Sequence, residues 1–166
     1  MENEIIEYDV VIIGSGPAGL QAALHAARRK VGVAVLGKLK KSSLSKYHLE
    51  NYCCMDAKIN GDDFLESGKR QAERAGAIFR QEDVLEITKG DDRRYRLAIE
   101  SGKVIITKAL ILAMGISRNR LGKPGEKELM GKGVSYCVDC DGGFFKKQKV
   151  AVVGNESAAA SGAMTM

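Results

Sequence analysis

Two cysteines and an aspartate in the last third of the sequence have the spacing of a redox centre. Cys137 and Cys140 are separated by two residues, and Asp141 follows directly. Two thiols at this spacing can close a small disulfide ring, and the arrangement commonly lowers the pKa of one thiol. A carboxyl group beside the pair can carry a proton as thiolates form and leave. We therefore expect a redox-active pair with Asp141 as its proton carrier.

A zinc half-site and a pair of inert buried thiols are the alternatives for these two cysteines. A four-ligand zinc site needs two more partners, and the sequence has no second C-x-x-C and no H-x-x-x-H, so we expect no metal. The neighbours Cys53 and Cys54 are expected to be small buried residues, with a ligand or redox role as the alternative, because adjacent cysteines rarely pair with each other. His25 and His48 are expected to be structural.

A glycine-rich segment near the N-terminus has the pattern that binds a nucleotide diphosphate. Gly14-Ser15-Gly16-Pro17-Ala18-Gly19 is a G-x-G-x-x-G sequence that directly follows an apolar run and opens an Ala-rich stretch. The first glycine makes a tight turn, the second lets backbone approach a pyrophosphate, and the third allows close packing of helix on strand. The helix N-terminus then faces the anion. We expect dinucleotide binding, and a purely structural turn is the alternative.

The residues expected to follow the second strand argue against an ordinary NAD site. Such a site carries a carboxylate for the ribose about 20 residues after the glycine motif begins. This chain has Leu36-Gly37-Lys38 there, with no acidic residue.

The elements that must position these motifs alternate between strands and helices. Residues 8–13 and 31–36 are apolar and β-branched, residues 18–29 are rich in Ala, and residues 37–59 form a long polar segment expected to be functional. Asp62 is expected to cap a helix through Glu73 that ends at Gly76, and residues 77–80 to form a third strand.

The later part of the sequence has a different residue pattern. Short β-rich runs at residues 84–88, 95–100 and 104–107 predict a three-stranded antiparallel meander, and residues 109–114 predict a further apolar strand. A glycine-rich, charged loop over residues 118–132 is an expected domain boundary. Residues 150–153 predict a strand, followed by an Ala-rich helix. We predict an α/β fold, with one domain over residues 1–118 and the start of a second over residues 119–166.

Composition narrows the class of protein. The chain has 166 residues, of which 45% are hydrophobic and 28% charged, and a net charge of +5. This apolar content excludes a disordered chain, and the apolar runs are too short to span a bilayer. The basic clusters at residues 38–41 and 146–149 are expected to be solvated loops, with a polyanion or acidic partner as the alternative. We expect a soluble cytoplasmic protein that binds neither nucleic acid nor membrane.

These motifs resemble a known family over essentially the whole chain. The glycine loop, Glu50-Asn51-Tyr52, residues 109–115 and the run from Gly133 through the cysteine pair to Gly142 are similar to the low-molecular-weight thioredoxin reductases. They resemble the related alkyl hydroperoxide reductase flavoprotein nearly as closely.

The resemblance implies two Rossmann-like domains, with FAD in the first and the redox cysteines in the second. It implies that Cys140 faces the isoalloxazine, that Cys137 attacks the disulfide of a thioredoxin-like partner, and that Asp141 is the general acid. We also expect a homodimer. The residues expected to bind the flavin nucleotide are Gly14, Ser15, Gly16, Pro17, Ala18, Gly19, Leu36, Gly37, Asn51, Val84, Ala113, Met114 and Gly115.

Three features of the sequence depart from the family pattern. Lys41-Ser42-Ser43-Leu44 replaces a Gly-Gly-Gln sequence, and Met114 replaces a threonine. Glu156 occupies the second-glycine position of a second nucleotide loop that begins at Gly154. At ~4 Å and an effective dielectric of about 20, a carboxylate repels a phosphate charge by roughly 4 kcal/mol, which is ~1000-fold in affinity.

We therefore expect weak or absent NADPH binding, with ferredoxin or a deazaflavin as the electron donor. The alternatives are an NADPH-dependent thioredoxin reductase or alkyl hydroperoxide reductase flavoprotein, a non-catalytic FAD- or nucleotide-binding module, and a zinc-binding interaction protein.

Overall fold

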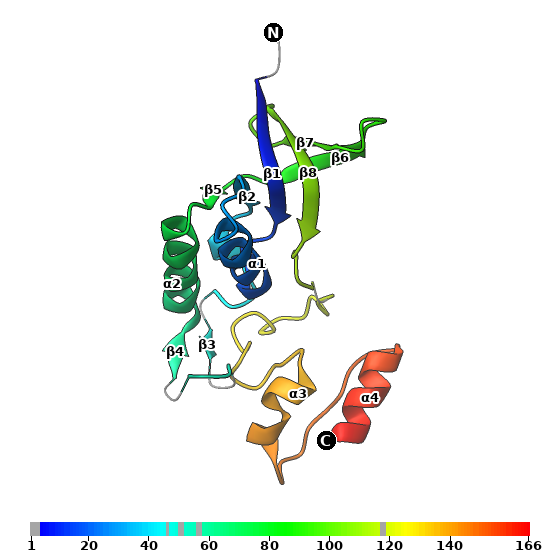
Figure 1. Cartoon of the computed structure of the whole chain (residues 1–166). Helices are drawn as coiled ribbons and strands as arrows, with labels where there is room; N and C mark the ends of the chain where they lie inside the picture. The colour runs from blue at the N-terminus through cyan, green and yellow to red at the C-terminus, as the bar shows by residue number, and fades with distance from the viewer. Residues whose placement is uncertain (1–3, 46, 50–51, 56–57, 117–118) are drawn as a thin grey trace. The chain divides into compact units, whose positions relative to one another are not determined.

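The chain divides into two compact units, residues 1–116 and residues 117–166. The computed structural model describes residues 4–45, 47–49, 52–55, 58–116 and 119–166 (Figure 1). The strands are β1 (Ile5–Ile13), β2 (Val33–Leu36), β3 (His48–Leu49), β4 (Ile59–Asn60), β5 (Ile78–Arg80), β6 (Val84–Lys89), β7 (Tyr95–Ile99) and β8 (Val104–Leu112). The helices are α1 (Pro17–Ala27), α2 (Gly61–Arg74), α3 (Val138–Asp141) and α4 (Ser157–Thr165), with 3₁₀ turns at Leu39–Lys41 and Gly142–Phe145.

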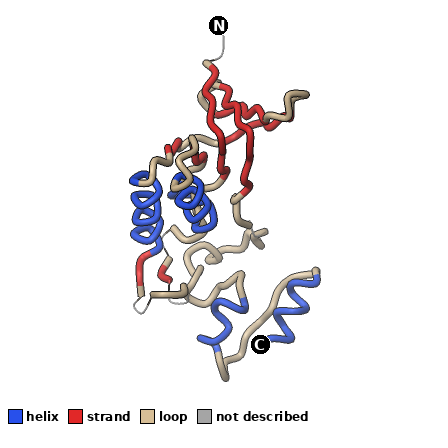
Figure 2. Tube along the Cα trace, in the orientation of Figure 1, coloured by secondary structure: helices blue, strands red, loops and turns tan. Residues whose placement is uncertain are grey.

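A six-stranded sheet with the order β5-β2-β1-β8-β7-β6 organises the first unit. Strands β5, β2, β1 and β8 run parallel, whereas β8, β7 and β6 are joined antiparallel as a meander. Strands β3 and β4 form a separate antiparallel pair. Figure 2 shows α1 and α2 side by side next to the parallel strands. The predicted α/β fold with a parallel sheet and an antiparallel meander is confirmed.

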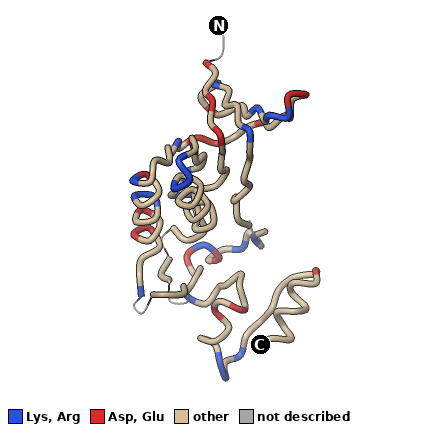
Figure 3. Tube along the Cα trace, in the orientation of Figure 1, with Lys and Arg blue, Asp and Glu red and all other residues tan. Residues whose placement is uncertain are grey.

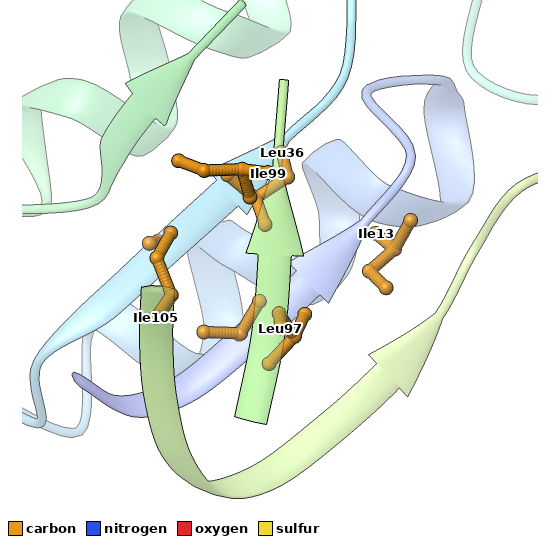
Figure 4. Close-up of a cluster of buried hydrophobic side chains, with 7 residues drawn as sticks. Ile13, Leu36, Leu97, Ile99 and Ile105 are labelled. Atoms are coloured by element: carbon orange, nitrogen blue, oxygen red, sulfur yellow. The ribbon is translucent and has the colours of Figure 1, made fainter. Parts of the chain in front are cut away.

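The two faces of β1 and β2 enter different cores, because successive side chains of a strand point in opposite directions. Ile12 and Val35 are completely buried with Ala23 of α1 and Ala72 of α2. On the opposite face, residues of β1 and β2 pack against the meander. That second cluster is Val11, Ile13, Ala34, Leu36, Leu97, Ile99 and Ile105 (Figure 4).

The two strands predicted at residues 104–107 and 109–114 are one continuous strand, β8. It pairs with β1 on one side and, through its first half, with β7 on the other. The charged Lys108 does not end the strand, because its ammonium group lies 2.7 Å from the Asp9 carboxylate at an exposed position. Thr107 beside it is buried and donates its hydroxyl to the Asp9 carbonyl oxygen at 3.1 Å. The prediction of two separate strands was therefore wrong, because it took the charged Lys108 as the end of a strand.

Helix α2 begins differently from the prediction. The capping residue is Asn60, whose side-chain oxygen accepts the backbone N–H of Asp62 at 2.8 Å, so Asp62 is not the cap. Asp62 lies in the first turn, where its negative charge is favourable for the helix dipole. The predicted end is correct, since Gly76 follows the helix with a φ of +104°.

In the second unit, α3 and α4 pack together through a glycine. A β-carbon on Gly162 of α4 would lie 3.0 Å from Cγ2 of Val138, so the absence of a side chain permits the contact. The Ala-rich helix is where the sequence predicts it. The predicted strand at residues 150–153 is absent, because residues 119–166 contain no strand that could pair with it.

Among the described residues, no helix is both long and apolar enough to cross a bilayer.

Helix α1 packs against the end of β1 so closely that there is no room for a side chain at the points of contact. A β-carbon on Gly19 would lie 1.8 Å from the carbonyl oxygen of Gly14, and one on Gly14 would lie 2.2 Å from the carbonyl oxygen of Ala113. A β-carbon on Gly16 meets only the Ser42 hydroxyl, at 3.7 Å. Gly14 and Gly19 are therefore structural requirements, whereas Gly16 is not.

Replacing Gly19 by Ala is expected to lower the free energy of unfolding by about 3 kcal/mol, because helix and strand must separate to admit the methyl group. The matched variant Gly16→Ala is expected to cost no more than about 1 kcal/mol, the loss of a favourable N-cap. Denaturant unfolding of both variants measures the difference. Equal stability of the two would contradict the packing described here.

Candidate functional site

The carboxyl ends of β1, β2 and β8 meet at one edge of the parallel sheet. The Gly14 N–H donates to the Leu36 carbonyl at 2.8 Å, and the Ala113 N–H donates to the Ile13 carbonyl at 2.7 Å. The Gly37 N–H donates to the Arg80 carbonyl of β5 at 3.1 Å. Residues predicted to bind one nucleotide, although distant in sequence, therefore lie together at the edge where open α/β sheets bind ligands.

The N-terminus of α1 opens onto this edge with free backbone donors. Gly16 is its N-cap and no side chain caps it, Pro17 occupies the first turn, and that turn contains no acidic residue. Gly37 has a φ of +145°, and a β-carbon there would lie 3.2 Å from the Ser15 nitrogen. The structure thus presents uncovered N–H groups and a positive helix end, which fit the diphosphate of a nucleotide.

The remaining predicted nucleotide-binding residues are placed as follows. Ser15 is buried in the glycine loop, and Val84 is half-buried at the start of β6 against the cluster that contains Leu36. Met114 is 65% exposed just past β8, and Gly115 follows with a φ of +68°. Asn51 lies outside the described residues.

An ion-pair network ties the segment after β2 to the meander. The Lys38 ammonium group lies 3.1 Å from the Asp83 carboxylate and 2.5 Å from that of Glu100, while Lys41 lies 2.7 Å from Asp83. Hydrogen bonds from Lys41 and Lys38 hold the pKa of the Asp83 carboxyl below its usual range. Hydrogen bonds to Glu100 and Asp83 raise the pKa of Lys38.

The prediction that residues 38–41 are simply solvated is therefore wrong for Lys38, because two carboxylates distant in sequence partner it. Lys146, Lys147 and Lys149 are exposed, as expected. Figure 3 shows basic and acidic residues interspersed along both units.

The cysteine pair lies in the second unit and is joined as a disulfide. Cys137 precedes α3 and Cys140 lies within it, with their Cα atoms 5.2 Å apart. Cys137 is half-buried and Cys140 exposed, and Asp141 at the end of α3 is half-buried. Val138, which lies between the two cysteines in sequence, is held against Gly162 of α4. The pair can accept two electrons and two protons on a segment that α4 supports.

Sequence reasoning missed Ser135, whose hydroxyl is hydrogen-bonded to both the Cys137 backbone and the Asp141 side chain. It accepts the N–H of Cys137 at 3.0 Å and donates to the Asp141 carboxylate. A serine two residues before a helix cap is a recognisable pattern for such a backbone contact, but the second bond depends on the turn of α3.

The other cysteines differ from expectation. Cys53 and Cys54 are exposed and unpaired thiols, with their sulfurs 3.6 Å apart, rather than buried apolar residues. They lie in the turn between β3 and β4, and neither side chain packs into a hydrophobic core. His25 and His48 are also exposed. Within the described residues, no three His, Cys, Asp or Glu side chains gather as a metal site.

Glu126 holds the segment that leads into the cysteine pair. Its buried carboxylate accepts the N–H groups of Leu121 at 3.0 Å, Gly122 at 2.6 Å and Lys123 at 3.1 Å. Burial raises the pKa of Glu126, but these three hydrogen bonds and the charge of Arg120 outweigh it, so the pKa lies below its ordinary value. The ionised side chain therefore organises this turn.

The Glu126 contacts predict a pH-dependent stability. Because the folded-state pKa is lowered, the stabilisation is present above the unfolded value of about 4.3 and is lost as pH falls through the folded value. Between about pH 5 and pH 3, the melting temperature of the unaltered chain should fall more steeply than that of Glu126→Gln. The exposed neighbour gives the control variant Glu128→Gln, which should follow the unaltered chain. Parallel curves for all three proteins would contradict this role.

Comparison with known proteins agrees with this geometry. The family model for pyridine nucleotide-disulphide oxidoreductases matches residues 8–163. A thioredoxin reductase from Listeria monocytogenes is 35% identical over 161 residues, covering 96% of this chain and 50% of that protein. A bifunctional thioredoxin reductase/thioredoxin from Mycobacterium leprae is 39% identical over 158 residues, covering 92% of this chain and 33% of that protein.

Solved structures show the same similarity. Thioredoxin reductase from Streptococcus pyogenes is 33% identical with a TM-score of 0.84, covering 95% of this chain and 51% of that one. The atypical thioredoxin reductase TRi from Desulfovibrio vulgaris Hildenborough is 41% identical with a TM-score of 0.62, covering 95% of this chain and 52% of that one. The chain spans about half the length of most of these relatives, or less. With a glycine-lined cradle, a C-x-x-C disulfide and a family match over nearly its whole length, the chain belongs to the pyridine nucleotide-disulphide oxidoreductase family.

Proposed function

We propose that this chain is part of a flavin-dependent disulfide reductase that passes electrons through the Cys137–Cys140 pair to a thioredoxin-like protein. The observation that carries the proposal is the disulfide itself, placed beside Asp141 in a chain that also contains a glycine cradle. A structural disulfide alone needs neither a neighbouring carboxyl group nor a nucleotide site. The relatives named thioredoxin reductases support this class of activity.

FAD is the cofactor that fits the cradle of the first unit. The diphosphate would approach Gly16, where the backbone is open, and would face the uncapped N-terminus of α1. Gly37 leaves the end of β2 without a side chain that would crowd the Ser15 N–H, and the adenosine ribose is proposed to lie beside it. When bound, FAD supplies a carrier of two electrons that can reduce a disulfide. Leu36, Val84, Ala113, Met114 and Gly115 are proposed to line the same nucleotide.

The two sulfurs then carry out thiol–disulfide exchange. Two electrons and two protons convert the Cys137–Cys140 disulfide into a dithiol. In the partner reaction, the Cys137 thiolate attacks one sulfur of the partner disulfide and the other sulfur leaves with the electron pair and a proton. Cys140 then attacks Cys137, which releases the reduced partner and restores the disulfide. Asp141 is proposed to supply and accept the proton.

A thioredoxin-like protein is the proposed partner. One relative combines a thioredoxin reductase with a thioredoxin in a single chain, which supports this pairing. The exposed free thiols of Cys53 and Cys54 fit a reducing compartment, and this supports the cytoplasmic location expected from the sequence.

The electron donor is proposed to be ferredoxin or a deazaflavin rather than NADPH. Glu156 is the N-cap of α4, is exposed, and makes no capping bond with its side chain. A pyrophosphate at this helix end would therefore meet a free carboxylate where the family pattern has a glycine.

Serine variants of the cysteines test the proposed activity. Both Cys137→Ser and Cys140→Ser are expected to abolish reduction of a thioredoxin-like disulfide, because each removes one sulfur of the exchanging pair. The matched variants Cys53→Ser and Cys54→Ser are expected to retain it. Activity is measured by release of thiols from an oxidised thioredoxin, with dithionite-reduced flavoprotein as the electron source. Retained activity in Cys140→Ser, or none in any form of the protein, would favour a non-catalytic nucleotide-binding module.

Variants of Glu156 test the donor. Anaerobic addition of micromolar NADPH should leave the flavin of the unaltered protein oxidised. Removing the carboxylate in Glu156→Gln should restore part of the affinity and Glu156→Gly more, up to ~1000-fold if charge repulsion is the main cause. The absorbance of the oxidised flavin measures each. Prompt bleaching of the unaltered protein would establish the NADPH-dependent alternative.

A further inference from the structure

Ser135 links the two chemical parts of the cysteine site. Its hydroxyl donates to Oδ2 of Asp141 at 2.5 Å, the nearer of two acceptors, since the carbonyl oxygen of Cys137 lies 3.3 Å away. The same hydroxyl oxygen accepts the backbone N–H of Cys137 at 3.0 Å. The N–H of Asp141 in turn donates to the carbonyl oxygen of Cys137 at 3.0 Å. Three short contacts thus close a ring that contains the first cysteine, the serine and the acid.

The neighbouring aspartate has no such support. Asp139 lies between the two cysteines and is exposed, and within the described residues it makes no hydrogen bond or ion pair. Two carboxylates therefore flank Cys140 in sequence, and only that of Asp141 is held by a hydrogen bond. This contrast separates a positioned acid from one that is simply nearby in sequence.

We propose that Ser135 is a positioning residue that holds the Asp141 carboxyl group beside the Cys137–Cys140 pair for proton transfer to the departing sulfur. The inference rests on the dithiol–disulfide function proposed above and adds a residue to it. Ser135 makes no hydrogen bond to either sulfur and acts through Asp141.

In the exchange step, an incoming thiolate attacks one sulfur of the pair, a new S–S bond forms, and the Cys137–Cys140 bond breaks. The departing sulfur takes the bonding electron pair and receives the proton of the Asp141 carboxyl group. The resulting carboxylate then accepts the Ser135 O–H, and water returns a proton to Asp141 before the next exchange.

The hydroxyl suits both protonation states of the acid. A serine oxygen has one donor and two acceptor positions. The N–H of Cys137 uses one acceptor position, which orients the oxygen relative to the cysteine backbone. The O–H then serves the ionised carboxylate, and the second acceptor position can receive the proton of the neutral acid. The position of Asp141 is therefore tied to the segment that carries Cys137.

Reduction of the disulfide by dithiothreitol tests the proposal without flavin or a protein partner. The second-order rate is followed by mass spectrometry after alkylation, in the unaltered chain and in Ser135→Ala, Asp141→Asn, the double variant and Asp139→Asn. Ser135→Ala should slow the reaction about tenfold, a fraction of what a positioned proton donor contributes. In the Asp141→Asn background, Ser135→Ala should change the rate no further, because the two residues act as one unit.

Two variants separate positioning from a merely structural role. Ser135→Thr keeps the hydroxyl and should retain the rate of the unaltered chain, and Asp139→Asn should also match it. The proposal is overturned if Ser135→Ala reacts at the unaltered rate, if it slows Asp141→Asn further, or if Asp139→Asn is as slow as Asp141→Asn. If Ser135→Ala does not fold, failure of Ser135→Thr to match the unaltered chain overturns it instead. A protein that shows this coupling but does not reduce thioredoxin refutes only the proposed function.

Discussion

Backbone atoms of β1, α1 and β8 approach one another at the edge of the sheet more closely than side chains would permit. The contact of Gly19 with the Gly14 carbonyl sets the start of α1 directly over the end of β1, and Gly14 is in turn closed against Ala113. Because of this approach, the free N–H groups of the helix point at the same space as the carboxyl ends of the strands. The proposed diphosphate site is a consequence of that packing, since no polar side chain has to build it.

In the second unit, a glycine contact also sets the position of the residues proposed to react. A glycine of α4 admits Val138, and Val138 fixes the single helical turn that carries the disulfide. Asp141 and Ser135 are brought together by that turn, so the acid, the serine and the cysteines form one local arrangement over seven residues. The two units thus divide the proposed reaction, with nucleotide binding in one and sulfur exchange in the other.

Local signals were sufficient where one segment determines its own structure. The glycine motif, the helix end at Gly76 and the cysteine spacing were all recognisable, because turn geometry and residue spacing act over a few positions. Contacts between distant segments were not recognisable. Lys38 is partnered by Asp83 and Glu100 from the meander, and Lys108 continues a strand because Asp9 lies beside it. The prediction of a strand at residues 150–153 was wrong for a related reason. A strand needs a neighbouring strand to pair with, and its own sequence does not specify that neighbour.

The central claim is that an open backbone at Gly16 receives the diphosphate of a flavin nucleotide. Titration of the flavin-stripped protein with FAD, followed by quenching of flavin fluorescence, tests it most directly when the Gly16→Ala variant is compared in parallel. The account predicts saturable binding by the unaltered protein and binding at least about tenfold weaker in the variant, because the added methyl group occupies the approach to the backbone N–H groups. Equal binding by the two folded proteins, or no binding by either, would contradict it.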